Sequence, residues 1–273
     1  EGGEGVRSED GRFVREEVSD RTREGLGSIS RSTSGVSGQT VQGAPSSGRA
    51  FWTRKFGSFG QRNGDGNAAQ INRTIGGVFF GGDTLIADKY LIGIASGYSN
   101  SSFNVSDRSS TSSSDNYHLA GYGGTQWGAL GLRIGAAHAW HVLQTNRSIE
   151  FASFSDHTKG NYTGGTTQVY GEFGYTLPLT ILSIEPFVRA AYVNFNAKGF
   201  GEVGGAASLN SSSNREGVTY TTAGFNAAKT FSSAGGSVTT VRGMCGWRHA
   251  LGNLTPISTF AFDGGSPFSI AVF

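Results

Sequence analysis

A strict two-residue alternation of side chains runs through most of the chain beyond residue 50, and it restricts the possible folds more than any other feature. Segment 129–143 shows it best. One face would carry Leu130, Leu132, Ile134, Ala136, His138, Trp140 and Val142, and the other Ala129, Gly131, Arg133, Gly135, Ala137, Ala139 and His141. Because neighbouring side chains of a β-strand point to opposite faces, this pattern predicts a strand with one large apolar face and one small or polar face.

The same period predicts nine strands in all. They cover 50–60, 73–82, 90–103, 115–126, 129–143, 166–177, 183–196, 217–230 and 237–251. The seventh strand repeats the division of faces, with Ile184 and Val188 on one side and Glu185 and Arg189 on the other. We therefore expect an all-β fold.

Composition excludes several other classes. The chain has 44 glycines in 273 residues, and glycine weakens helix interiors by about 1 kcal/mol each, which argues against a helical bundle. The single cysteine, Cys245, excludes a disulfide scaffold. A net charge of +2 gives no reason to expect a nucleic-acid partner. No run of 18 apolar residues predicts a membrane helix, but a transmembrane β-barrel looks polar on average because only half of its residues face lipid.

The connections between the predicted strands alternate in length. Those at 82–89, 127–128, 178–183 and 231–236 are short, whereas those at 61–72, 104–114, 146–165 and 197–216 are longer and polar. Short periplasmic turns and long extracellular loops are typical of an antiparallel up-and-down outer-membrane barrel. Aromatic residues near the strand ends suit the girdles of such a barrel: Trp52, Phe103, Tyr117, Trp127, Trp140 and Trp247.

The first 49 residues have a different character. Segment 8–23 is charged, Asp10 could cap it, and Phe13, Val14 and Val18 form a narrow apolar stripe at helical spacing. The stripe predicts a helix, which periodicity alone would equally place in solvent. Segment 24–49 is rich in Gly, Ser and Thr and predicts a flexible linker. Since the chain begins with Glu1 rather than Met, we expect it to be a piece of something longer.

Several long segments resemble the autotransporter translocator domain of the type V secretion system. They are FGSFGQRNGDGNAAQINRTIGGVFFGGD (56–83), SSDNYHLAGYGGTQWGALGLRIGAAHAWH (113–141), QVYGEFGYTL (168–177), IEPFVRAAYVNF (184–195) and GWRHALGNLTPISTFAFDGGSPF (246–268). Residues 8–23 are similar to the segment that precedes the barrel in this family and forms a helix in its lumen. The resemblance covers nearly all of 50–268.

This resemblance implies a monomeric twelve-stranded barrel in the lipid of a Gram-negative outer membrane, inserted by the barrel assembly machinery. It would anchor an N-terminal passenger and export it to the cell surface. Residues 1–49 would be the linker between passenger and barrel, with its helix near 8–23, and residues 50–273 the barrel domain. The family continues with about three more strands, and Thr255–Phe273 supply one further strand at most. We therefore expect an incomplete barrel with a gap or a strained seam between the first strand and the end of the chain.

Five charged residues fall on the small faces of their predicted strands and are candidates for the lumen: Arg133, Glu172, Glu185, Arg189 and Arg242. In hydrocarbon each would cost about 2–4 kcal/mol, so an inward orientation is expected. The charged helix would find partners there, although these side chains could equally pair only with one another across the barrel.

No motif predicts a catalytic, cofactor or metal site. His138 and His141 would lie on opposite faces of one strand, as would Asp115 and His118. Asp156 and His157 would lie solvated in a long loop. Residues 63–67 resemble a calcium loop but lack its later acidic ligands.

Two alternative functions stay open from the sequence. One is an outer-membrane barrel enzyme such as an omptin-like protease, and the other is a soluble β-rich adhesin fragment. An N-terminal helix that returns through the lumen would favour the translocator over both, because enzyme barrels lack such a helix.

Overall fold

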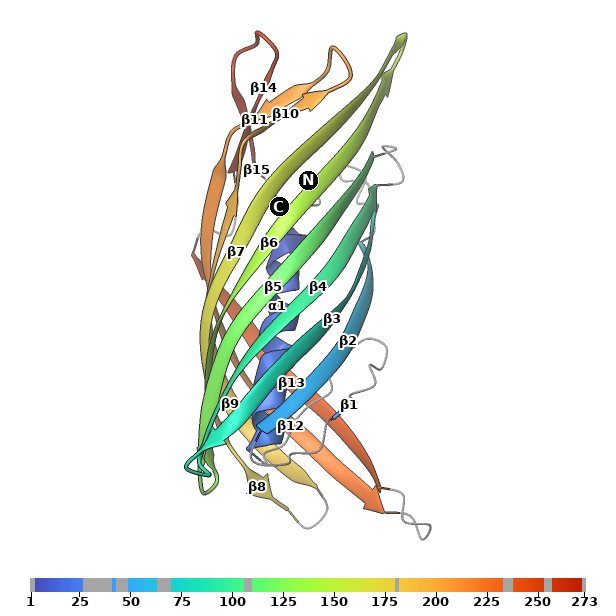
Figure 1. Ribbon diagram of the computed structural model, residues 1–273. Helices are drawn as coiled ribbons and strands as arrows, with labels where there is room; N and C mark the ends of the chain where they lie inside the picture. The colour runs from blue at the N-terminus through green and yellow to red at the C-terminus, as the bar shows by residue number, and fades with distance from the viewer. Residues whose placement is uncertain are drawn as a thin grey trace.

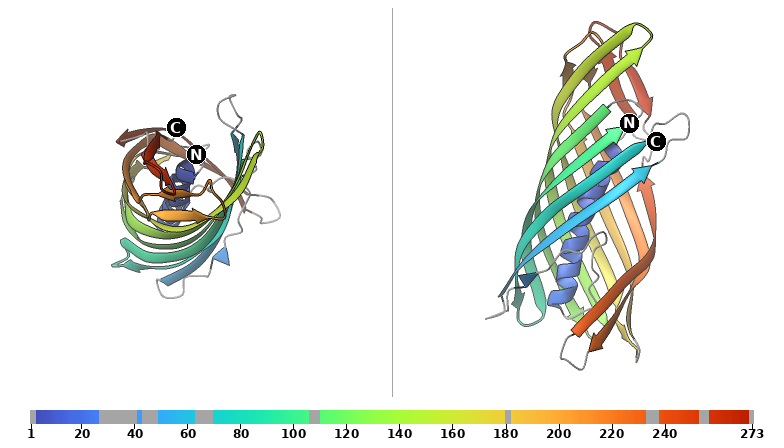
Figure 2. Two further views of the ribbon diagram at one scale, coloured as in Figure 1. Left: turned by 90° about the horizontal axis from the view of Figure 1, so that it is seen from above. Right: turned by 90° about the vertical axis from the view of Figure 1, so that its right-hand side faces the viewer.

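The computed structural model describes residues 3–26, 41–42, 49–62, 70–105, 110–179, 182–232, 238–252 and 257–271. Its architecture is a single antiparallel sheet that curls around one helix (Figures 1 and 2). The helix, α1, is Gly3–Gly25. No helix in the described ranges is both long and apolar enough to cross a membrane.

Nine long strands follow one another around the sheet, and each pairs with its predecessor through an antiparallel ladder. They are β2 (Arg49–Arg62), β3 (Ile71–Ile86), β4 (Tyr90–Val105), β5 (Ser110–Trp127), β6 (Leu130–Phe151), β7 (Phe154–Tyr175), β9 (Ser183–Ala197), β12 (Asn214–Ser232) and β13 (Val238–Gly252). The predicted nine-strand meander is therefore confirmed. In the described ranges no ladder joins β2 to β13 or to β15, the strand nearest the end of the chain.

Six short strands complete the sheet. Residues Val41–Gln42 (β1) pair with β2, and Leu177–Pro178 (β8) pair with β9. Beyond the β6–β7 hairpin the chain forms β10 (Phe200–Val203), β11 (Leu209–Ser211), β14 (Ile257–Phe262) and β15 (Phe268–Ala271). These four continue the ladder from β7 in the order β10, β11, β14 and β15.

Several predicted loops prove to be strand. Segment 146–165 was expected to be a long loop, but β6 and β7 continue through it as far as Phe151 and Phe154, so Asp156 and His157 lie in β7. The 197–216 connection contains β10 and β11. Thr255–Phe273 were expected to supply one strand at most, yet they supply both β14 and β15. By contrast, the turns after β3 and β5 are as short as predicted, with positive φ at Asp88 and Gly128.

The alternation of faces holds along the wall. Ile134, Ala136 and Val188 are exposed on the outer face, whereas Arg133 and Arg189 are buried on the inner face. This confirms the orientation predicted for segments 129–143 and 183–196, which are β6 and β9, and leaves the inner face for the helix.

The glycines on the inner face make room for large aromatic rings. A Cβ atom on Gly97 would lie 2.1 Å from Phe79, one on Gly81 would lie 2.3 Å from Trp52, and one on Gly93 would lie 2.4 Å from Tyr122. In each case the glycine and the aromatic residue are directly opposite each other in neighbouring strands. The rings therefore lie flat over the neighbouring backbone instead of projecting into the centre of the lumen.

Candidate functional site: the helix-filled lumen

The predicted helix lies inside the curled sheet. In Figure 1 its first residues lie toward the end of the molecule that carries the β6–β7 hairpin, and its last residues lie toward the start of β2. Viewed from above, the sheet surrounds the helix (Figure 2). The narrow apolar stripe therefore packs against protein, which periodicity alone left open and the family resemblance implied.

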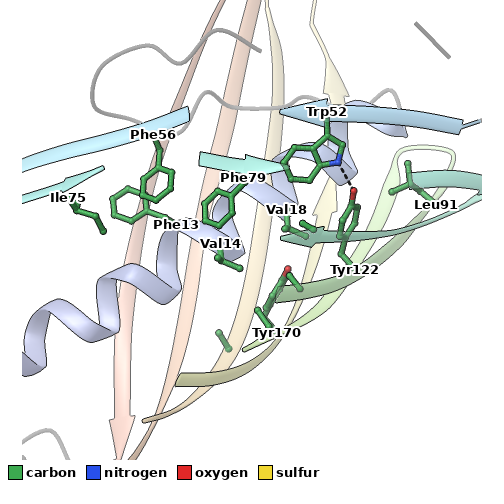
Figure 3. Packing of buried hydrophobic residues seen from close by; sticks show 14 residues of the cluster. Phe13, Val14, Val18, Trp52, Phe56, Ile75, Phe79, Leu91, Tyr122 and Tyr170 are labelled. Atoms are coloured by element: carbon green, nitrogen blue, oxygen red, sulfur yellow. Dashed lines mark hydrogen bonds between the residues drawn. The ribbon is translucent and has the colours of Figure 1, made fainter. Parts of the chain in front are cut away.

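The apolar stripe of α1 packs against aromatic residues of the wall (Figure 3). Phe13 stacks on Phe56 of β2 with ring centroids 4.7 Å apart, and Phe56 in turn stacks on Phe79 of β3 at 5.0 Å. Val14 and Val18 are buried in the same cluster. Burial of such side chains stabilises a docked helix by about 1.5–3 kcal/mol each.

A buried ion-pair network joins the last turn of α1 to β6, β7 and β9. Arg23 pairs with Glu172, lies 3.2 Å from Glu185 and lies 2.5 Å from Asp20 of its own helix. Arg133 contacts both wall carboxylates, at 3.1 Å to Glu172 and 2.9 Å to Glu185. The side chains of Arg23, Glu172 and Glu185 are fully buried, so the charges neutralise one another away from bulk water.

A second polar contact joins the C-terminal end of α1 to β3. Arg21 donates two hydrogen bonds to the Asp83 carboxylate of β3, at 2.6 and 2.8 Å. Tyr122 donates its hydroxyl hydrogen to Asp83 at 2.8 Å, and Trp52 donates its indole N–H to the Tyr122 hydroxyl at 2.8 Å. Such forked arginine–carboxylate bonds fix orientation as well as adding energy.

Four of the five predicted lumen residues come together in one place. Arg133, Glu172, Glu185 and Arg189 all line the first network, and Arg189 donates from Nε to Glu172 at 2.7 Å. Arg242 lies in β13 opposite Ala228, and its side chain is outside the described residues.

Two wall residues that contact the helix, Asp83 and Arg54, are not among the predicted lumen residues. Asp83 was placed in a turn because the strand was ended one residue too early. Arg54 of β2 forms ion pairs with Glu17 at 3.0 Å and with Glu24 at 2.6 Å, and the sequence pattern did not assign it to either face of its strand. Extending the alternation of the predicted strand 73–82 by a single residue would place Asp83 on the inner face.

A separate polar cluster lies on the inner face of β4–β7. Ser99 and His118 are 2.9 Å apart, and Asn116 bonds to Ser99 at 3.2 Å and to His141 at 2.7 Å. No Ser–His pair was predicted here, because it requires the register of two strands. Nδ1 of His118 has no hydrogen-bond partner in the part of the chain that the structure describes, so no third group there orients the ring as in a catalytic triad.

A second Ser–His contact lies in the β6–β7 hairpin. Ser148 Oγ is 2.9 Å from Nδ1 of His157, but Asp156 accepts from the backbone N–H groups of His157 and Ala207. Residues 63–67, the calcium-like segment, lie outside the described residues. In the described ranges no group of three or more His, Cys, Asp or Glu side chains could hold a metal ion.

Comparison with known proteins agrees with this architecture. A family model described as the autotransporter beta-domain matches residues 51–272. An extracellular serine protease of Serratia marcescens is 30% identical over 243 residues, which is 89% of this chain and 22% of that protein. The chain thus spans about a fifth of the length of that curated relative.

Two solved structures share the fold. The translocator domain of the autotransporter NalP from Neisseria meningitidis superposes with a TM-score of 0.58 at 14% identity, covering 98% of this chain and 92% of that chain. The beta domain of the Bordetella autotransporter BrkA gives a TM-score of 0.57 at 15% identity, covering 81% and 89%.

Proposed function

Because the chain belongs to the autotransporter beta-domain family and is an outer-membrane translocator domain of a Gram-negative bacterium, we propose that α1 anchors an exported passenger within the lumen. The passenger would be joined to the N-terminal side of α1 and would leave the barrel at the end that carries the β6–β7 hairpin (Figure 1). The observation that carries this proposal is the buried ion-pair network that holds Arg23 to Glu172 and Glu185.

The position of the network suits an anchor. Arg21 and Arg23 belong to the last turn of α1, so the helix is held most strongly at the end that leads toward β2. Pulling the helix out toward the β6–β7 hairpin would separate both arginines from buried carboxylates, and separating a buried ion pair costs about 3–5 kcal/mol. The other end of the helix remains free to join a passenger.

We also propose that outer-membrane lipid surrounds a belt between two rows of aromatic residues. Tyr98, Tyr117 and Trp140 lie in register across β4, β5 and β6. Trp127 and Tyr175 flank Leu130 at the other end of β5, β6 and β7. Ten residues separate Leu130 from Trp140, and with the usual strand rise and tilt they span about 25 Å, the height of the apolar band of such barrels.

The side chains between the rows support this assignment. Exposed apolar residues fill the outer face there: Ile94, Leu119, Ile134, Val169 and Phe173. A patch of this kind on a soluble protein would favour aggregation. The belt therefore favours an embedded barrel over a soluble adhesin fragment.

The remaining assignments follow from the same proposal. Residues 1–49 serve as the linker that carries the lumen helix, and residues 50–273 as the barrel domain. One chain supplies both helix and wall, so a monomer is the working unit, and the barrel assembly machinery would insert it. The domain itself has no catalytic part in this proposal, because within the described residues neither Ser–His contact has an acid partner on its imidazole.

An epitope experiment on intact cells tests the orientation. An epitope placed ahead of Glu1 in the natural full-length protein should be labelled by antibody on intact Gram-negative cells. A matched epitope in the turn at Gly128, at the other end of the barrel, should be labelled only after the cells are permeabilised. Labelling of the first epitope only after permeabilisation would refute the proposed direction of export.

A further inference from the structure

Arg15 of α1 is a buried arginine without a carboxylate. Its side chain lies in the lumen with the residue 3% exposed, and its hydrogen bond joins Nη1 to Oε1 of Gln168 at 2.6 Å. Every other arginine of the helix–wall contacts has a carboxylate within 4.0 Å: Arg12, Arg21, Arg23, Arg54, Arg133, Arg189 and Arg248. Within the part of the chain that the structure describes, Arg15 has none.

More positive charge surrounds Arg15. Arg189 of β9 and Arg248 of β13 are both in register with Thr222 of β12, so they lie in one row across the inner wall. Both are close enough to Arg15 to repel it electrostatically, whereas the neighbouring Glu16 attracts it. Arg12 precedes Arg15 by one helical turn and therefore projects from the same face of α1. We call Arg12, Arg15, Arg189 and Arg248 the arginine cluster.

The nearby carboxylates do not balance this cluster. Glu16 is 3.6 Å from both Arg12 and Arg248, which is too long for a hydrogen bond. Glu172 bonds to Arg189 but also serves Arg23 and Arg133. Among the described residues, the buried Nε atoms of Arg12 and Arg15 find no hydrogen-bond partner. Buried charged donors are normally paired, because leaving them unpaired carries the full cost of desolvation.

From these observations we infer that the arginine cluster is a binding site for an oxyanion in the lumen. A guanidinium presents parallel N–H donors whose spacing matches the oxygens of a carboxylate or a phosphate. Such an ion would accept from Nε of Arg12 and Arg15 and would offset the repulsion among the four side chains. The oxyanion is either free in solution or a carboxylate carried by a polypeptide segment in the lumen. The inference requires the fold alone and is independent of the direction of export.

Inorganic phosphate tests the first source. The natural full-length protein is purified in detergent, and the midpoint of thermal unfolding is measured against phosphate concentration, with chloride holding the ionic strength constant. We expect a saturable rise of the midpoint in the wild type. In Arg15→Met the half-saturating phosphate concentration should be about tenfold higher, as expected for the loss of one charged contact. The matched control Arg215→Met removes an exposed arginine of β12 and should leave the response unchanged.

The variant Arg15→Lys tests the second source. It keeps the positive charge, so it should disturb folding less than Arg15→Met, and it places an ammonium group at position 15. A carbodiimide forms an amide between an ammonium and a carboxylate that touch each other. A cross-link from position 15 to a carboxylate other than Glu16 or Glu172, located by mass spectrometry, identifies a polypeptide-borne ligand. Two results together would overturn the inference. The first is that Arg15→Met and the wild type give the same phosphate response, or that neither protein responds. The second is that no such cross-link forms.

Discussion

Arg133 of β6 and Glu172 of β7 are directly opposite each other in the ladder, and their side chains meet at 3.1 Å on the lumen side of the wall. Glu172 also pairs with Arg23 of the helix, so the same carboxylate joins two neighbouring strands and holds α1 in the lumen. The network makes the docking of α1 depend on single charges of the wall.

Replacing Glu172 by Gln should therefore release the end of the helix. The substitution leaves Arg23, Arg133 and Arg189 short of a buried carboxylate, and we expect a loss of about 3–5 kcal/mol in docking free energy. Limited proteolysis of α1 in the folded barrel measures the release. Arg147→Met is the control, because the Arg147–Glu202 pair of the β6–β7 hairpin lies partly in solvent and should contribute about 1 kcal/mol or less. Equal protection of α1 in both variants would contradict the assignment.

Replacing Tyr122 by Phe should loosen the other side of the helix end. The change removes the hydroxyl that accepts from Trp52 and donates to Asp83, leaving a buried indole N–H without its partner. We expect a cost of about 1–3 kcal/mol, together with a shift of Trp52 fluorescence. The thermal midpoint of the folded barrel reports the loss. Tyr192→Phe, on the exposed outer face of β9, should leave the midpoint unchanged, and a similar drop in both variants would show that the lumen contact is not responsible.

Replacing Gly97 by Ala should strain the wall. The new methyl group would meet the Phe79 ring, which already contacts the rings of Phe56 and His118. Overpacking of this kind costs about 1–3 kcal/mol. Heat-modifiable gel mobility gives the midpoint. Gly121→Ala is the matched control in β5, because a Cβ atom there meets nothing within 4 Å. If Gly97→Ala and Gly121→Ala lowered the midpoint equally, the close packing of the Phe79 ring over Gly97 would not be supported.

Lipids with brominated acyl chains should distinguish outer from inner tryptophans. In single-tryptophan variants, Trp127 and Trp140 should be quenched because they are exposed on the outer face at the two aromatic rows. Trp52 should resist quenching because it is buried in the lumen, only 2% exposed. Quenching of Trp52 as strong as that of Trp140 would be incompatible with the proposed lipid belt.

The sequence predicted the membrane-height parts of the strands well, because there the two environments differ sharply. Between Leu130 and Trp140 one face meets apolar residues or lipid and the other meets the lumen, so the alternation is clear. Beyond Trp140 the β6–β7 hairpin carries polar residues on both faces, as at the successive positions Gln144 and Thr145, and the period of two in hydrophobicity disappears. The continuation of these strands was missed for that physical reason.

The lumen was predictable only in part. Arg133, Glu172, Glu185 and Arg189 could be assigned to the inner face from alternation within single strands. Their assembly around Arg23 depends on the stagger between strands and on the rotation of the helix, which no local pattern encodes. The contact between Ser99 and His118 was missed for the same reason, since each residue alone is an ordinary polar position.

The flat packing of aromatic rings over glycines has a consequence for how such a wall can diverge. Phe79 can keep its ring only while position 97 carries no side chain, and Gly97 is required only while the ring is present. Substitutions at the two positions are therefore coupled, because a change at one of them destabilises the protein unless the other changes as well. Among homologues of this domain, exchanges at 79 and 97, 52 and 81, and 93 and 122 should occur as linked pairs.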